Sequence, residues 1–91
     1  MIEYEFKAVF LNDAGNERHK AGMDTHADEW NELIPVTINL DSIESYFQCK
    51  QPAFGQTICK IYTRSGQDWS VAISYQELKN LKKSIFAPQS N

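Results

Sequence analysis

Residues 57–74 carry the pattern of a β-hairpin, which constrains the fold more than any other part of the chain. The turn at residues 63–66 ends in Gly66, which suits a type I turn followed by a bulge. The bulged register gathers the apolar residues of both strands on one face, whereas a two-residue loop would oppose Tyr62 to Trp69 and Lys60 to Val71. The predicted pairs are Ile61 with Trp69, Cys59 with Val71, and Thr57 with Ile73.

This register directs a second set of hairpin side chains to the other face of the sheet. The set comprises Ile58, Lys60, Tyr62 and Arg64. Basic and aromatic side chains alternate along it, and tyrosine and arginine are common where proteins meet. We therefore predict that Lys60, Tyr62 and Arg64 contribute to a partner-binding surface.

Three further segments alternate between apolar and polar residues, as half-buried strands do. They start with residues 2–10 and continue with residues 36–40 and 43–47, before the sequence Gln51-Pro52-Ala53-Phe54-Gly55 breaks the pattern. The first strand could offer an open edge to which a partner adds a strand.

Ser74-Tyr75-Gln76-Glu77 is a capping-box pattern and predicts the start of a helix. Leu78, Leu81, Ile85 and Phe86 form its apolar stripe, and Pro88 ends it before a tail at residues 88–91. Residues 1–91 are thus expected to form a single α+β domain, a mostly antiparallel sheet of four to five strands with one C-terminal helix packed on one face.

Residues 12–31 are polar, contain two glycines and lack a sustained apolar period. A long polar loop or excursion is expected there. Within it, Thr25 and Asp28 could cap a short helical turn that presents Ala27, Trp30 and Leu33 on one side and ends before Pro35. The segment could therefore be a loop throughout or contain this short helical turn.

Phe54 lies between Pro52 and Gly55, where the composition predicts a loop tip. A bulky apolar side chain there either folds back onto the core or anchors a partner. We include Phe54 among the candidate partner-binding residues.

The formal net charge of −3 hides an uneven distribution. Residues 1–45 carry ten acidic and three basic residues, and residues 46–91 carry two acidic and six basic residues. The two halves could therefore present complementary surfaces, within one molecule or between copies, or their charges could simply mix on one surface. No apolar run approaches the ~20 residues of a membrane span, and the acidic N-terminus lacks the features of a secretory signal, so a cytoplasmic location without membrane contact is expected.

Sequence offers little for catalysis or metal binding. Cys49 and Cys59 are expected to stay reduced, although they could close a loop in an oxidising compartment. Together with His19 and His26 they lack the close ligand spacing of a zinc site. No nucleophile with a base, phosphate-binding loop or carboxylate pair is evident, so we expect no enzymatic activity, no metal and no cofactor.

Residues 36–86 resemble the small flagellar-operon FlbD-like proteins. The resemblance lies in residues 38–44 (INLDSIE), 60–66 (KIYTRSG) and 74–78 (SYQEL). It implies a strand, an aspartate-containing bend, a hairpin and a capped terminal helix. The helix also resembles the terminal helix of LytTR-type DNA-binding domains, whose further basic segment and final strand have no counterpart here.

The sequence leaves two candidate functions for the chain. The second face of the sheet is partly apolar, through residues such as Val9, Leu11, Ile58 and Tyr62, and needs a cover. Residues 12–35 could supply it through Trp30, or a second copy could, in a homodimer. We therefore favour a non-catalytic protein-interaction or assembly module. The alternative is a nucleic-acid-binding or regulatory protein that uses the basic C-terminal half, through Lys60, Arg64, Lys79, Lys82 and Lys83.

Overall fold

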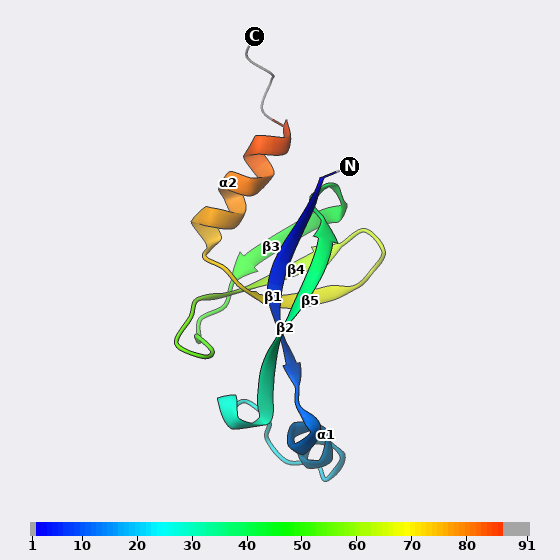
Figure 1. The fold of residues 1–91 in the computed structure, drawn as a ribbon, viewed down its shortest axis with the longest axis vertical. Coiled ribbons are helices and arrows are strands. Elements are labelled where there is room, and N and C mark those ends of the chain that lie inside the picture. Colours follow the sequence, from blue (N-terminus) through cyan, green and yellow to red (C-terminus); the bar gives the residue numbers. More distant parts are fainter. Residues whose placement is uncertain (1, 87–91) are drawn as a thin grey trace.

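A computed structural model describes residues 2–86 of the chain. These residues form an elongated molecule of 56 × 26 × 18 Å (Figure 1). The elements in chain order are β1 (Glu3–Leu11), α1 (Asp13–Lys20), the 3-10 turn η1 (Asp28–Trp30), β2 (Asn31–Asn39), the 3-10 turn η2 (Leu40–Ser42), β3 (Ile43–Gln48), β4 (Ile58–Thr63), β5 (Asp68–Ala72) and α2 (Tyr75–Phe86).

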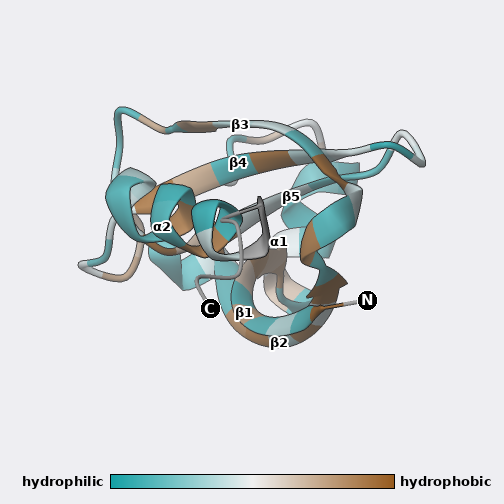
Figure 2. Cartoon of the chain, turned by 90° about the horizontal axis from the view of Figure 1, so that it is seen from above, coloured by the Kyte–Doolittle hydropathy of each residue, from teal (hydrophilic) through white to brown (hydrophobic). Residues whose placement is uncertain are grey.

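Residues 2–86 form one five-stranded antiparallel sheet in the order β2-β1-β5-β4-β3. The helix α2 lies on one face of this sheet, within its curve (Figure 2). The predicted α+β architecture is confirmed, with α1 as a second, short helix. The expected contacts of Ile85 and Phe86, the helix stop at Pro88 and the tail at residues 88–91 lie outside the described part of the chain.

The β4–β5 hairpin has the bulged register predicted from its sequence. Cys59 is opposite Val71, and Ile61 is opposite Trp69. The third predicted pair, Thr57 with Ile73, lies just beyond the ends of both strands. Parity therefore identified the buried face of this hairpin correctly, because slipping by one residue would have turned the apolar set toward solvent.

The expectation that the first strand offers an open edge is wrong. β1 pairs with β2 over its whole length, from Glu3 opposite Asn39 to Leu11 opposite Asn31, and with β5 at Ala8 and Val71. Within residues 2–86 the edges of the sheet are β2 and β3.

The expectation of a polar loop over residues 12–31 is wrong in its first part, where α1 forms. Asn12 caps this helix by accepting a hydrogen bond from the Gly15 amide at 2.7 Å. Asp13 in the first turn and the basic residues of the last turn suit the helix dipole. Gly15 is the one buried residue within α1, so the helix has no apolar stripe for a periodicity search to detect.

The helical turn expected near Trp30 is shorter than predicted. η1 covers Asp28–Trp30 and has no side-chain cap, while Leu33 already belongs to β2. β2 also includes Pro35. Pro35 was expected to follow the helical turn and to precede a strand that starts at residue 36. An edge strand tolerates proline because one side of its backbone has no neighbouring strand.

The β1–β2 hairpin extends beyond the other strands and carries α1 and η1 at its far end (Figure 1). Contacts of side chains inside the tip stabilise this end of the hairpin. The guanidinium of Arg18 lies 4.5 Å from the centre of the Trp30 ring. The Asn31 side-chain amide donates to the carbonyls of Thr25 and Ala27, at 2.8 and 2.9 Å. The hairpin tip therefore holds a defined shape.

The hydrophobic core lies between α2 and the concave face of the sheet. Leu78 of α2 is fully buried, and Leu81 packs against the same cluster. The buried residues of the cluster are Phe6, Ala8, Ile38, Leu40, Ile43, Cys59, Ile61, Val71, Ile73 and Leu78. Neither helix of residues 2–86 combines the length and the apolar character needed to cross a membrane.

Gly15 allows α1 to lie directly against the backbone of Trp30. A Cβ at this position would collide with the Trp30 carbonyl oxygen. We therefore expect Gly15→Ala to lower the free energy of unfolding by about 1–3 kcal/mol, as measured by urea denaturation followed by tryptophan fluorescence. Asn16→Ala, at an exposed position of the same helix, is the control. Equal urea midpoints for the two variants would contradict the close approach.

Candidate interaction surface

A β-bulge in β3 decides which aromatic side chains reach the convex face of the sheet, which we call the outer face. Ile43 is opposite Thr63, but Ser45 is opposite Tyr62, so Glu44 is an extra residue in the ladder. Without the bulge, alternation would place Ile43 and Phe47 on the same face. With it, Ile43 is buried in the core and Phe47 is directed outward.

Phe47 and Tyr62 form a stacked pair on the outer face. Their ring centroids lie 6.2 Å apart, with 26° between the ring planes. Phe47 is 49% exposed and Tyr62 is 38% exposed. Lys60, opposite Phe47 in the ladder, forms an ion pair of 3.5 Å with Asp68. We call Phe47, Lys60, Tyr62 and Asp68 the aromatic patch.

The patch includes two of the four predicted partner-binding residues, Lys60 and Tyr62. Sequence analysis missed Phe47, because its alternation with Ile43 counts it as a core residue. The signal that could have found it is the register of β3 against β4, which only a pairing partner reveals.

The predicted strip along β4 is exposed to solvent at one end only. Ile58 lies on the outer face by its pairing with Ala72, yet it is 4% exposed. Arg64 follows the last residue of β4 and is exposed in the turn, where its amide donates to the Ser42 carbonyl at 2.9 Å. The strip therefore contributes Lys60 and Tyr62 to the patch, and Arg64 lies beyond it.

Phe54 lies away from the patch, in the loop between β3 and β4. Ala53 and Gln56 exchange two backbone hydrogen bonds around Phe54 and Gly55, whose φ angles are 54° and 68°. Positive φ at both central residues defines a type I′ turn. Among residues 2–86, Phe54 is the one non-glycine residue with positive φ, and a bulky side chain is costly there.

The Phe54 loop is tied to the hairpin tip. The Phe54 amide donates to the Asp28 carboxylate at 3.0 Å. The side chain is half-buried, and Phe54 is not among the residues packed against the main core. Of the two expectations for Phe54, folding back onto the core is not what the structure describes, and anchoring a partner stays a prediction.

The lysines of α2 are on the other face of the sheet from Lys60. Lys82 is half-buried, and its ammonium donates to the carbonyls of Leu40 and Ile43, each at 3.0 Å. Burial lowers the pKa of Lys82, as does the positive charge of Arg64 to a smaller extent, while Asp41 opposes the shift. Lys83 is exposed and Lys79 half-buried. The five residues of the predicted nucleic-acid surface thus do not share one face.

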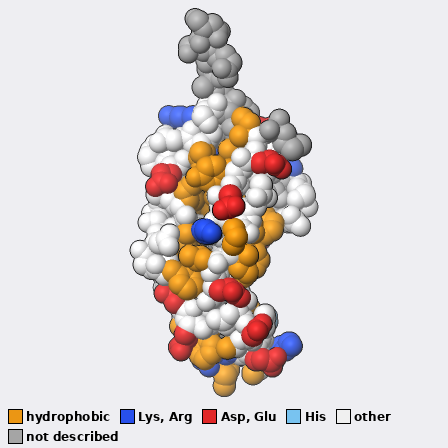
Figure 3. All heavy atoms as spheres, in the orientation of Figure 1, with side chains coloured by type: hydrophobic (Ala, Val, Ile, Leu, Met, Phe, Trp, Pro, Cys, Tyr) orange, Lys and Arg blue, Asp and Glu red, His pale blue; other side chains and the backbone are white. Residues whose placement is uncertain are grey.

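The charges on the face that carries β1 and β2 are also unfavourable for binding phosphate. Figure 3 shows acidic side chains along the length of the face on which β1 and β2 lie in front, with hydrophobic side chains between them. Lysine and arginine side chains are sparse on this face.

The candidate metal ligands are dispersed. His19 lies on α1 and His26 follows in the tip, both exposed, whereas Cys59 is fully buried in the core. Cys49 is half-buried, and both cysteines are free thiols. No group of three potential ligands comes together within residues 2–86.

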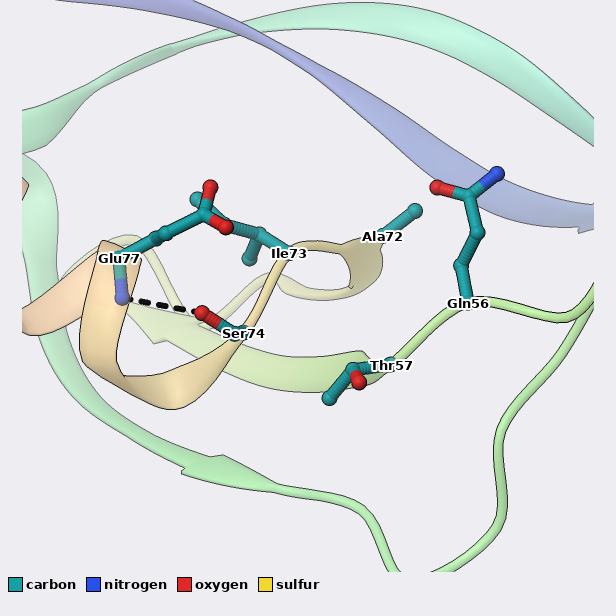
Figure 4. Close-up of a pocket in the computed structure, with 6 residues that line it drawn as sticks. All are labelled: Gln56, Thr57, Ala72, Ile73, Ser74 and Glu77. Atoms are coloured by element: carbon teal, nitrogen blue, oxygen red, sulfur yellow. Dashed lines mark hydrogen bonds between the residues drawn. The ribbon is translucent and has the colours of Figure 1, made fainter.

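A shallow hollow of about 320 Å³ lies where β5 leads into α2 (Figure 4). It is lined by Gln56, Thr57, Ala72, Ile73, Ser74 and Glu77. The Ser74 hydroxyl accepts a hydrogen bond from the Glu77 amide at 3.1 Å, half of the predicted capping box. This contact assigns the Ser74 hydroxyl to the helix cap, and Glu77 is the one carboxylate in the lining.

Searches of protein-family models, curated proteins and solved structures find no match to this chain. The resemblance to FlbD-like proteins and to LytTR-type domains therefore stays a prediction.

The contacts of Lys82 predict a structural role. Lys82→Ala removes the ammonium that bonds the Leu40 and Ile43 carbonyls, so it should lower the free energy of unfolding by about 1–2 kcal/mol. Lys83→Ala, at an exposed position one residue on, should change it by less than about 0.5 kcal/mol. Thermal unfolding of both variants provides the comparison, and equal stabilities would remove the structural role.

Cys59 should be inert in the folded chain. Burial, with a smaller contribution from Cys49, raises the pKa of Cys59, so little thiolate forms. In a Cys49→Ser variant, we expect a thiol reagent at pH 8 to react with Cys59 only as fast as the chain unfolds. Rapid reaction under native conditions would contradict the burial.

The same pKa shift makes stability depend on pH. The folded chain holds the Cys59 proton to a higher pH than the unfolded chain does, so the stabilisation is fully present below the ordinary thiol pKa of about 8.5. It is lost as the pH rises through the folded pKa. Replacement of Cys59 by valine should therefore flatten the decline of the melting temperature between pH 8 and pH 10.

Proposed function

We propose that this chain is a non-catalytic protein-interaction or assembly module, and that the aromatic patch is its contact surface. The observation that carries the proposal is the stacked pair of Phe47 and Tyr62, exposed on the sheet face opposite α2. Two neighbouring aromatic rings left in water are an unfavourable arrangement for an isolated domain, and their burial by a partner recovers hydrophobic free energy.

The surroundings of the pair support protein contact. Tyrosine and phenylalanine are enriched at the centre of protein interfaces, where charged groups form the rim. Here Lys60 and Asp68 form an ion pair beside the rings, so they neutralise each other and leave no net charge next to the apolar centre. A patch with this composition favours an apolar protein surface over a charged ligand.

The nucleic-acid alternative has less support. Single-stranded nucleic acid would need bases stacked on the rings and lysines along the backbone path. Lys60 is paired with Asp68, and Lys82 bonds two backbone carbonyls on the opposite face. The remaining basic residues of this proposal lie apart from the stacked rings.

A photo-crosslinking amino acid placed at Tyr62 tests the proposal in cells that express the chain. We expect covalent protein adducts from position 62, because the rings would be covered by the partner. The matched control is position 4. Tyr4 is 38% exposed, as Tyr62 is, but lies on β1, three strands away from β3 in the sheet.

Two outcomes would contradict the proposal. One is an equal yield of adducts from positions 62 and 4, and the other is no protein adduct from position 62. A nucleic-acid adduct at position 62, together with oligonucleotide binding by the purified chain, would transfer support to the alternative.

A further inference from the structure

The backbone of β3 has hydrogen-bonding groups directed away from the sheet. The Cys49 amide donates to the Ile58 carbonyl at 2.8 Å, which places these two residues in a hydrogen-bonded pair. In an antiparallel ladder such pairs alternate with pairs that do not bond each other. Phe47 therefore bonds to β4, whereas the amides and carbonyls of Tyr46 and Gln48 point outward from the edge.

The other edge of the sheet is less suited to pairing. The Leu40 amide donates to the Ile2 carbonyl at 2.8 Å, and the same alternation places the backbone nitrogen of Pro35 on the outward side of β2. Proline has no N–H, so the middle of this edge lacks a donor. Of the two edges within residues 2–86, β3 is the one with outward amides and carbonyls at consecutive outward positions, Tyr46 and Gln48, on the regular side of its bulge.

We propose that β3 pairs antiparallel with β3 of a second copy, about a two-fold axis at Phe47. This inference rests on the proposed function and names the partner of the aromatic patch. Tyr46 of each copy would bond Gln48 of the other, which satisfies the outward amides and carbonyls of both strands. Phe47 would lie opposite Phe47 of the second copy in the pair type that brings side chains closest.

The register follows from the limits of β3. A two-fold axis at Tyr46 would pair Gln48 with Glu44, the bulged residue, where the ladder is interrupted. An axis at Gln48 would pair Tyr46 with Lys50, which lies beyond the end of the strand. A two-fold axis midway between two residues would place a residue with outward amide and carbonyl groups opposite a residue whose groups already bond to β4. Only the axis at Phe47 joins residues in the regular part of both strands.

The proposed register brings the aromatic patches of the two copies together on one continuous outer face. Phe47 and Tyr62 of one copy would meet the same pair of the other, forming a row of four rings across the outer face. Cross-strand aromatic pairs of this kind stabilise antiparallel sheets. The two stacked rings thus become the centre of an isologous interface.

Charge also favours a second copy. An exposed acid, Glu44, lies at the bulge near the start of β3, and an exposed base, Lys50, lies two residues beyond its end. In the register centred on Phe47, Glu44 of each copy comes near Lys50 of the other, just outside the regular part of the new ladder. The strand with its flanks is therefore electrostatically complementary to itself when reversed, which is what a two-fold axis requires.

Charge reversal tests both the partner and the register. Sedimentation equilibrium at low salt would give the dimer dissociation constant of the wild type, Glu44→Lys, Lys50→Glu and the double variant. Each single variant opposes like charges at two symmetric contacts and should raise the constant about tenfold. The double variant restores both contacts with reversed polarity and should return the constant to within about threefold of the wild type.

Matched controls change the same net charge elsewhere. Glu29→Lys and Lys20→Glu are exposed positions in the hairpin tip, far from β3, and neither should change the constant as the single variants do. Circular dichroism confirms that every variant keeps its fold.

Each result decides the inference. A wild-type chain that stays monomeric at millimolar concentration overturns pairing between copies. A dimer whose constant changes additively, without rescue in the double variant, overturns the register. In either case, crosslinks from position 62 to a different protein would leave the proposed function intact, and adducts between two copies alone are expected if the inference holds.

Discussion

The sheet depends on one close contact, between Ala8 of β1 and Val71 of β5. Among the described residues this is the pair that joins the β1–β2 hairpin to the three other strands, and both side chains are fully buried. Leu78 of α2 belongs to the same buried cluster as Ala8 and Val71, so one core spans both parts of the sheet. Side-chain packing on the concave face therefore compensates for a short backbone ladder at the junction.

Local patterns predicted the parts of the fold that local interactions determine. Alternation and parity gave the register of β4 and β5, because only one register buries the apolar residues together. The capping box gave the start of α2. By contrast, α1 was not predicted, because its stability comes from the Asn12 cap and from backbone contact at Gly15, and not from an apolar stripe. The pairing of β1 with β2 spans the whole tip, and no short window of sequence contains it.

The interaction surface was predicted in part, and the reason is the bulge at Glu44. Lys60 and Tyr62 were placed on the outer face because β4 is regular. Alternation alone places Phe47 on the same face as Ile43. The extra residue of the bulge turns the side chains that follow it to the opposite face, and alternation does not reveal this residue. Phe54 was predicted from its setting at a loop tip and Arg64 from the alternation along β4, and the structure places both outside the stacked pair, in separate turns. Side-chain type thus identified candidates, while strand register decided which of them lie together.

Pro35 limits the size of an assembly that grows through the edges of the sheet. A sheet with two open edges can add copies at both ends without limit and grow into a fibre. In this chain the nitrogen that proline leaves without hydrogen faces outward in the middle of β2. Growth through strand addition would therefore stop after one event, and the product would be a closed particle with blunt ends. In the proposed assembly, this single imino acid on the edge opposite the aromatic rings would keep the product finite instead of polymeric.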